Sequence, residues 1–203
     1  NALNTMAFPS LGQMQSESVA AVADMLHGDT AAGFLTSGGT ESILMAVKAA
    51  RERGRKERSI SEPNVVVADN AHAAFHKGAY YFGLEMRKTP VRSDWTADPE
   101  AFAGAVDDNT VLVVGSAPAY PQGVIDPIPE LAAIAADVGA NFHTDACMGG
   151  FVLPFMESLG MDVPPWDFRV PGVTSISMDW HKYAYAAKGA SVVLYREPEL
   201  RRQ

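Results

Sequence analysis

Apolar residues along the chain follow two different spacings. From Leu11 to Leu26 they recur every three or four positions, which predicts an amphipathic helix that has Ser10 as its N-cap and Gly28 beyond its end. After this helix, short apolar runs rich in β-branched residues alternate with stretches of helical spacing. We expect strands in a run after Gly33 and in residues 64–69, 84–89, 110–117, 140–146, 173–179 and 190–196.

Glycine and proline mark the boundaries of the predicted helices. Residues 43–50 keep a helical spacing that Gly54 can close, and a helix near 71–82 is expected to end at Gly83. Other helix starts and ends are indicated at Asp98 with Pro99, at Pro129 and at Gly139. Because helices separate most of the seven strands, the pattern predicts an α/β layered domain with a mostly parallel sheet.

Composition is consistent with one large domain and limits its partners. The 203 residues are 47% hydrophobic and 20% charged, which is enough to bury one substantial core. Lys and Arg number 16 against 24 acidic residues, so the formal charge is −8. No basic run is long enough to follow a phosphate backbone, and the cluster at 51–58 is interpreted as a solvated helix end. Nucleic acid is therefore not expected as a partner.

The single cysteine, Cys147, excludes an internal disulfide framework and favours a reducing compartment. No apolar run reaches the roughly 20 residues of a membrane helix, and no secretory signal is present, so a cytoplasmic protein is expected. Residues 1–30 are expected to form an N-terminal segment with a helix, and residues 31–203 the large domain. The missing initiator Met and the helix start at the end of the sequence predict a piece of a longer protein.

The segment "TSGGTES" joins a predicted strand to a predicted helix. Gly38 and Gly39 let the backbone approach an anion, the helix start directs free N–H groups at it, and Ser37, Thr40 and Ser42 supply hydroxyls. This arrangement is typical of a phosphate site; the alternative is a tight turn capped by Thr40. Neither a P-loop nor a G-x-G-x-x-G pattern is present, which disfavours a nucleotide.

Asp145 ends the apolar strand of residues 140–146. An unpaired buried carboxylate costs several kcal/mol, so this side chain is expected to face a cation or a strong donor such as a protonated ring nitrogen. The alternative is a cap for the next helix. His72 follows the strand of residues 64–69, where an imidazole can stack on a flat ring or transfer a proton, or simply cap a helix.

Lys182 and Lys188 lie in one turn between the two last strands. Desolvation and neighbouring positive charge would lower the pKa of Lys182 and make it nucleophilic, as a Schiff base requires; a solvated lysine is the alternative. His181 is either an anion ligand or a polar neighbour. A zinc site is a minor alternative, because His72, His76, His143 and Cys147 follow no recognised zinc spacing, although the first two share a helix face.

Taken in chain order, these motifs resemble the fold-type I pyridoxal-phosphate enzymes, and within them the group II decarboxylase family. The likeness runs through "TSGGTES", "AHAAFHKGA", "GSAPAYPQGVIDPIPELAAIA", "HTDACMGGFVLPFME" and "WDFRVPGVTSISMDWHKYAYAAKGASVVLY". It implies a three-layer large domain with a seven-stranded sheet, pyridoxal 5'-phosphate as cofactor, and a homodimer with a shared active site. It also implies a C-terminal small domain that this chain lacks.

The resemblance assigns a role to each candidate residue. Lys182 would form the Schiff base with the cofactor, Asp145 would pair with its pyridine nitrogen, and His72 would stack on its ring. Lys188 would lie near the phosphate or the reacting centre of the substrate. The remaining predicted cofactor-binding residues, which would hold the cofactor phosphate, are Gly38, Gly39, Thr40 and His181.

Within the family, the chain is most similar to lyases of phosphorylated sphingoid bases. This likeness implies that a base takes the proton of the 3-hydroxyl and that the C2–C3 bond breaks in a retro-aldol step, giving a long-chain aldehyde and phosphoethanolamine. An amino-acid decarboxylase and an inactive truncated relative are the alternatives. Departures from the lyase pattern, which bear on the substrate more than on the cofactor, are Gln122, Trp180, Ala184 and Ala187.

Overall fold

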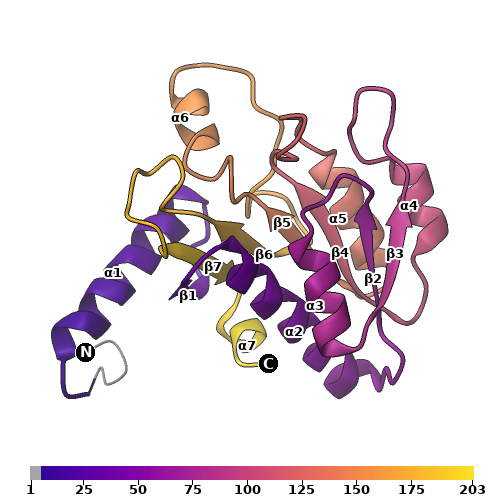
Figure 1. Cartoon of the computed structure of the whole chain (residues 1–203), viewed down its shortest axis with the longest axis horizontal. Coiled ribbons are helices and arrows are strands. Elements are labelled where there is room, and N and C mark those ends of the chain that lie inside the picture. Colours follow the sequence, from indigo (N-terminus) through magenta and orange to yellow (C-terminus); the bar gives the residue numbers. More distant parts are fainter. Residues whose placement is uncertain (1–5) are drawn as a thin grey trace.

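A single seven-stranded sheet runs through the middle of the computed structural model, which describes residues 6–203 (Figure 1). Its strand order is β1-β7-β6-β5-β4-β2-β3, and β7 alone pairs antiparallel with its neighbours β1 and β6. The strands are β1 Ala32–Thr36, β2 Asn64–Ala68, β3 Glu85–Thr89, β4 Thr110–Ser116, β5 Asn141–Asp145, β6 Val173–Met178 and β7 Ser191–Tyr195. The prediction of a mostly parallel sheet of seven strands is confirmed.

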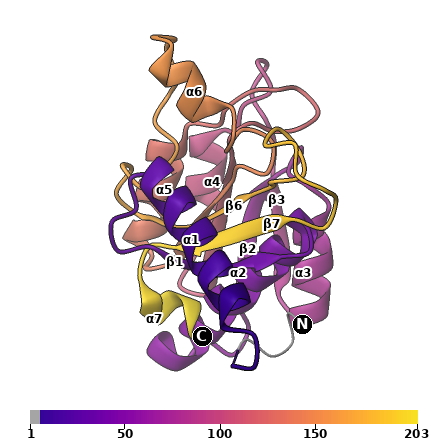
Figure 2. The same ribbon diagram turned by 90° about the vertical axis from the view of Figure 1, so that its left-hand side faces the viewer.

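Helices cover both faces of this sheet (Figure 2). They are α1 Pro9–Met25, α2 Gly39–Arg58, α3 Ala74–Phe82, α4 Pro99–Ala105, α5 Ile128–Asp137, α6 Leu153–Ser158 and α7 Pro198–Arg201. On one face, Phe102 and Leu131 from α4 and α5 share a core with Phe142 of β5. On the other, Ile43 and Phe75 from α2 and α3 share a core with sheet residues. The three-layer architecture is therefore confirmed.

The strand directions bring distant loops to one edge of the sheet. Strands β2, β4, β5 and β6 are parallel, so the loops that follow them start at the same edge, at the top of Figure 1. Strand β1 also ends there, because Thr36 pairs with Ser191 at the start of β7, and β7 is antiparallel to both β1 and β6. In open α/β sheets, ligands bind at this edge.

Two predicted helix boundaries are wrong. Ser10 lies inside α1, which begins at Pro9 after the N-cap Phe8. Gly54 does not close α2, which continues to Arg58 and ends at Ser59 in a left-handed conformation (φ 56°). Gly54 is instead buried where a Cβ would lie 2.5 Å from Cγ1 of Val111, so close packing against the sheet explains the glycine.

Two other predicted boundaries are confirmed. Gly83 ends α3 with a φ of 68°, a conformation that glycine adopts without strain. Asp98 caps α4, since its Oδ1 accepts the N–H of Glu100 at 3.1 Å. Such local signals act within a few residues, and packing against the sheet did not override them here.

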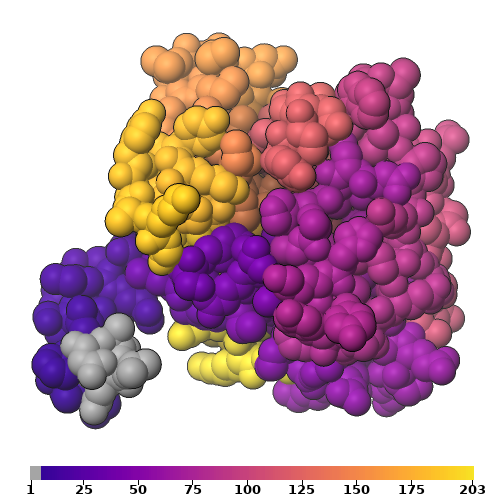
Figure 3. Space-filling model, viewed as in Figure 1, coloured from indigo at the N-terminus to yellow at the C-terminus, as the bar shows by residue number. Residues whose placement is uncertain are grey.

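The N-terminal helix packs on the sheet only through its last turns. Val22 and Leu26 are buried in the core that α4 and α5 share, whereas the first part of α1 projects from the body (Figure 3). The division of the chain at residue 30 stays a prediction. Within residues 6–203, no helix is both long and apolar enough to cross a bilayer.

Candidate active site

A cavity of about 480 Å³ opens at the edge of the sheet where these loops meet. We call it the main cavity. Its lining comes from the ends of strands β1, β2, β5 and β6 and from the loop before β7, so residues far apart in sequence come together. The lining residues are Ser37, Gly38, Gly39, Thr40, Ile43, His72, Asp145, Cys147, Asp179, His181, Lys182, Lys188 and Gly189. The eight residues to which the family resemblance assigned a role all belong to this lining.

The glycine segment opens α2 at the floor of the main cavity. Gly38 is the N-cap of this 20-residue helix, whose first-turn N–H groups lack partners within the helix. Gly39 passes so close to its neighbours that a Cβ would lie 2.8 Å from Sγ of Cys147 and 2.9 Å from Oδ2 of Asp179. The helix start is therefore held directly beside the polar groups of the cavity.

Two of the three predicted hydroxyl donors in this segment are already engaged. The N–H and Oγ of Ser37 donate to Oε2 of Glu41 at 2.7 and 2.6 Å, which lowers the pKa of Glu41. Ser42 is fully buried, 2.6 Å from the hydroxyl of Thr36. The expectation that Ser42 offers its hydroxyl to a ligand is therefore wrong, and Thr40 is the hydroxyl residue that lines the cavity without such a bond among the described residues.

Asp145 ends β5 with a carboxylate that is only 7% exposed. Its Oδ1 accepts the N–H of Cys147 at 3.1 Å and lies 3.5 Å from Oγ of Ser177. These contacts belong to the turn after β5, and the next helix, α6, begins only at Leu153, so the alternative that Asp145 caps a helix is wrong. No ion pair to Asp145 occurs among residues 6–203. A buried carboxylate with only neutral partners at a cavity wall is suited to bind a positively charged ligand group.

His143 lies beneath Asp145, fully buried on the same strand. Its Nδ1 is 2.8 Å from Oγ of Ser175 and its Nε2 is 3.0 Å from Oγ of Ser177. Burial lowers the pKa of His143 to about 4, although the charge of Asp145 acts in the opposite direction. The imidazole is therefore neutral at physiological pH. The sequence analysis considered His143 only in the minor zinc alternative and did not predict its place beside Asp145; a histidine inside an apolar strand was the available signal.

Lys182 is held by a carboxylate that the sequence analysis missed. Its Nζ lies 2.9 Å from Oδ2 of Asp179, which is 2% exposed at the end of β6. Burial lowers the pKa of Lys182, but the hydrogen bond to Asp179 and the nearby negative charges outweigh it and raise the pKa. The predicted lowering by neighbouring positive charge is therefore wrong for this structure. Asp179 could have been found, because like Asp145 it is a carboxylate at a strand end.

His181 directs one ring nitrogen at the backbone and the other toward the carboxylate of Asp179. Its Nδ1 donates to the C=O of Ala190 at 2.8 Å, and its Nε2 is 3.8 Å from Oδ2 of Asp179. Since Nδ1 keeps its proton for Ala190, Nε2 can donate to an anion only when the ring is protonated.

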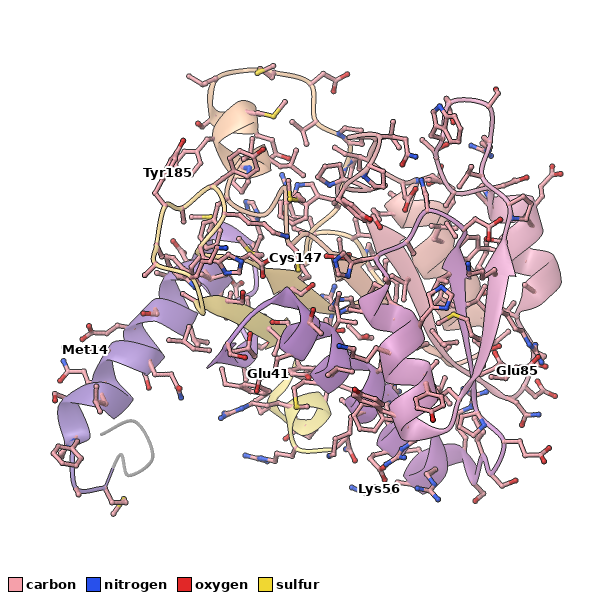
Figure 4. The ribbon with its side chains drawn as sticks, viewed as in Figure 1. Met14, Glu41, Lys56, Glu85, Cys147 and Tyr185 are labelled. Atoms are coloured by element: carbon pink, nitrogen blue, oxygen red, sulfur yellow. The ribbon has the colours of Figure 1, made fainter. Side chains whose placement is uncertain are left out.

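The loop that carries Lys188 is exposed on its outer side. Tyr185 is 89% exposed with a φ of 58°, and it points away from the body in Figure 4, whereas Cys147 lies near the centre. Lys188 lies at the mouth of the main cavity and forms no ion pair with any residue from 6 to 203.

Burial raises the pKa of Cys147 well above its usual value, so this thiol is protonated and not a nucleophile.

His72 combines the capping role with a place in the main cavity. Its Nδ1 accepts the N–H of Ala74 at the start of α3, which is the capping alternative. Its ring also lines the cavity and lies edge-on to Tyr120, with 5.4 Å between ring centroids. His76 is exposed on α3. Within the described part of the chain, no three His, Cys, Asp or Glu side chains are grouped to hold a metal.

None of the four departures from the lyase pattern belongs to the lining of the main cavity. Gln122 accepts a hydrogen bond from Asn70 at 3.3 Å, and Ala187 is exposed. Trp180 packs on Phe151, with ring centroids 4.6 Å apart, and its indole N–H has no partner among residues 6–203. Ala184 is half-buried against the main core.

Comparisons with known proteins agree with this fold and this arrangement. Residues 1–203 match the family described as "Pyridoxal-dependent decarboxylase conserved domain". The chain is 45% identical over 208 residues to sphingosine-1-phosphate lyase of Oryza sativa subsp. japonica and 46% identical over 204 residues to sphingosine-1-phosphate lyase 1 of Rattus norvegicus. These alignments cover 100% of this chain, but 39% and 36% of the two relatives.

Solved structures show the same likeness. Sphingosine-1-phosphate lyase of Burkholderia pseudomallei matches with a TM-score of 0.97 at 45% identity, over 100% of this chain and 48% of that one. Glutamate decarboxylase of Lactobacillus brevis matches with a TM-score of 0.88 at 25% identity, over 98% and 48%. The chain thus spans less than two fifths of the two curated relatives. Because the family match extends over all its residues, the chain belongs to the pyridoxal-dependent decarboxylase family.

Proposed function

We propose that this chain is the cofactor-binding part of a lyase that cleaves a phosphorylated sphingoid base to a long-chain aldehyde and phosphoethanolamine. The family consists of pyridoxal-phosphate-dependent lyases. The single observation that carries the proposal is that the buried carboxylate of Asp145, the amine of Lys182 and the glycine-rich start of α2 face one cavity. These three groups match the ring nitrogen, the aldehyde and the phosphate of the cofactor.

The residues of the main cavity fit pyridoxal phosphate. Its volume of about 480 Å³ lies within the range of small-molecule sites, roughly 300–1,000 Å³. Free N–H groups at Gly39 and Thr40, with the positive end of the α2 dipole, suit the phosphate, and the ring of His181 lines the same cavity. Gly38 leaves open space beside the helix start, where a Cβ would meet no atom within 4 Å.

Asp145 is the partner we assign to the pyridine nitrogen. Desolvation of a buried carboxylate without a cationic partner is unfavourable, and a protonated ring nitrogen beside Asp145 would offset that free-energy cost. A carboxylate at this place keeps that proton on the ring. His72 is the side chain we assign to the ring face. When bound, the cofactor supplies an electron sink for the electron pair released at the α-carbon of the substrate.

Lys182 is the residue we assign to covalent attachment of the cofactor. Its ammonium must first lose a proton, and the carboxylate of Asp179, 2.9 Å away, holds that proton in place. When it is not attached to the cofactor, the amine of Lys182 would lie in the main cavity and could transfer protons. Lys188 at the cavity mouth offers a second cation, which suits the phosphate of the substrate.

The unpaired Lys188 favours a phosphorylated substrate over an amino acid, and the relatives at 45–46% identity are lyases. The decarboxylase alternative rests on the glutamate decarboxylase match at 25% identity. We also propose a cytoplasmic homodimer with a shared active site. Exposed apolar side chains on and before α1, at Met6, Phe8 and Met14, support the dimer. The single cysteine, a buried free thiol, supports the cytoplasmic location.

Borohydride reduction of the protein mixed with pyridoxal phosphate, followed by peptide mapping, tests the cofactor site. The label is expected on Lys182 and is expected to be absent from a Lys182→Ala variant, with Lys77→Ala on the exposed face of α3 as the matched control. Labelling that persists in Lys182→Ala would overturn the assignment. A protein that binds no cofactor supports the inactive-relative alternative.

Product analysis then decides the reaction. Long-chain aldehyde released from a phosphorylated sphingoid base supports the lyase, and carbon dioxide released from an amino acid supports the decarboxylase. In the lyase, Lys188→Ala is expected to raise KM for the phosphorylated base about tenfold or more, while cofactor attachment at Lys182 is unchanged. Light scattering of the full-length holoenzyme tests the dimer.

A further inference from the structure

A second cavity, of about 420 Å³, lies beside the main cavity. We infer that it binds the hydrocarbon chain of the substrate. This inference rests on the proposed function and deepens it, because it assigns the apolar part of the substrate a place that the cofactor site does not provide. The cavity is formed by three segments, residues 118–125, residues 148–156 and Tyr183. Figure 3 shows the coral and orange segments, residues 118–125 and 148–156, in the upper part of the molecule.

The lining of the second cavity is chemically unlike that of the main cavity. Its wall is built mainly by Ile125, Met148, Val152, Leu153 and Met156, and no described residue in the lining carries a charge. The main cavity instead contains two lysines, two histidines and two aspartates. A ligand that uses both cavities must therefore be polar at one end and apolar at the other.

The two cavities share walls at three places. Cys147 lines the main cavity, and the next residue, Met148, lines the second cavity. Lys182 likewise lines the main cavity, and Tyr183 lines the second. The ring of His72 in the main cavity meets the ring of Tyr120 in the second, with centroids 5.4 Å apart. A substrate whose amine lies near Lys182 is therefore separated from the second cavity only by residues such as Tyr183.

An alkyl chain suits this cavity better than a compact polar side chain. The methionines at 148 and 156 are flexible and polarizable, so they can adapt to a chain that has many conformers. Burial of each methylene contributes about fourfold in affinity. Because the volume is limited, this gain must stop once the cavity is full, and the chain length at which it stops is a property of the lining.

A series of 2-aminoalkyl phosphates of increasing chain length is the probe. These compounds carry the amine and the phosphate but lack the 3-hydroxyl, so retro-aldol cleavage cannot consume them. Their dissociation constants are measured with the full-length holoenzyme from the change in cofactor absorbance. We expect affinity to rise about fourfold per added methylene and then to reach a plateau.

Variants in the lining locate the effect. Met156→Trp reduces the cavity volume, so the plateau is expected at a shorter chain, with the affinity of the shortest probe unchanged. Val152→Phe, from another part of the same wall, gives a second measurement if Met156→Trp fails to fold. Leu159→Trp is the matched control, because Leu159 ends the same helix, is 79% exposed and does not line the cavity.

Three outcomes would overturn the inference, and they are distinguishable. If affinity does not change with chain length, the apolar site is wrong while the lyase proposal stands. If the plateau is the same in both lining variants and in the control, the chain binds elsewhere, for example on a second subunit. If even the shortest probe fails to bind to cofactor-loaded enzyme, the proposed function fails and the inference fails with it.

Discussion

The ammonium of Lys182 lies 2.9 Å from the carboxylate of Asp179, which is buried at the end of β6. The other oxygen of this carboxylate accepts the hydroxyl of Ser191 at 2.6 Å, so β7 fixes its orientation. Through Asp179, the loop that carries Lys182 is therefore bonded to the end of β6 and to the start of β7. The pair also holds Lys182 in the protonated form, which cannot attack an aldehyde.

Asp179→Asn is expected to speed covalent attachment of the cofactor at neutral pH several-fold. Removal of the charge lowers the pKa of Lys182, so a larger fraction of the amine is neutral and the pH profile of attachment shifts to lower pH. Stopped-flow absorbance over a pH series measures this. Ser191→Ala, which keeps the carboxylate, is the control. A variant with an unshifted profile would show that Asp179 does not control the proton of Lys182.

The same pair predicts a dependence of stability on pH. Since the pKa of Lys182 is raised above 10.5 in the folded chain, the pair stabilises the fold below pH 10.5, and this contribution is lost as pH rises through the raised value. The difference in free energy of unfolding between the native chain and Asp179→Asn, about 1–3 kcal/mol, is therefore expected to shrink at alkaline pH. Urea titrations on both sides of this range measure it.

Gly39→Ala and Gly38→Ala form a matched pair in the glycine segment. In Gly39→Ala the added methyl group would lie 2.8 Å from Sγ of Cys147 and 2.9 Å from Oδ2 of Asp179, and relief of this overlap is expected to cost about 1–3 kcal/mol. In Gly38→Ala the methyl group would meet no atom within 4 Å, so the expected cost is about 1 kcal/mol or less. Thermal unfolding without cofactor measures both. Equal losses would contradict the close approach at Gly39.

The sequence predicted the parts of this molecule that depend on local signals. The apolar runs gave the seven strands, and parallel strands must bring the residues after them to one edge, which is why His72, Asp145 and Lys182 could be placed together. Contacts across the sheet were not predictable in the same way. Gly54 is typical of a helix end, but the glycine is required by close packing against Val111, which lies far along the chain. The pKa of Lys182 depends on its contact with the carboxylate of Asp179, which the spacing of apolar residues does not predict.

Ser59→Gly is expected to stabilise the chain by about 0.5–1 kcal/mol. Ser59 ends α2 with a φ of 56°, a conformation in which a side chain is unfavourable and glycine is not. Its side chain is exposed, so the substitution removes no core contact. The free energy of unfolding in urea measures the gain, and Ser61→Gly in the exposed turn nearby is the control. A loss of stability would mean that the higher conformational entropy of glycine in the unfolded chain outweighs the removal of backbone strain at this residue.

His143, on the same strand as Asp145, is a buried neutral imidazole. Burial lowers its pKa from 6.5 to about 4, so between these values the unfolded chain binds more protons than the folded chain. Stability therefore falls as pH falls through this window, by about 3 kcal/mol in total from this group. His143→Gln is expected to be less stable than the native chain above pH 6.5, by about 1–3 kcal/mol, because the bonds to Ser175 and Ser177 are weakened.

On acidification, however, the two proteins are expected to converge, since glutamine does not titrate. Other groups whose pKa the fold shifts, such as Asp126, whose pKa burial raises, are present in both proteins and cancel in the difference. Urea unfolding at several pH values between 6.5 and about 4 gives that difference directly. A constant difference across the window would mean that His143 is protonated in the folded chain. In that case a positive charge, and not a neutral ring, would support Asp145 from below.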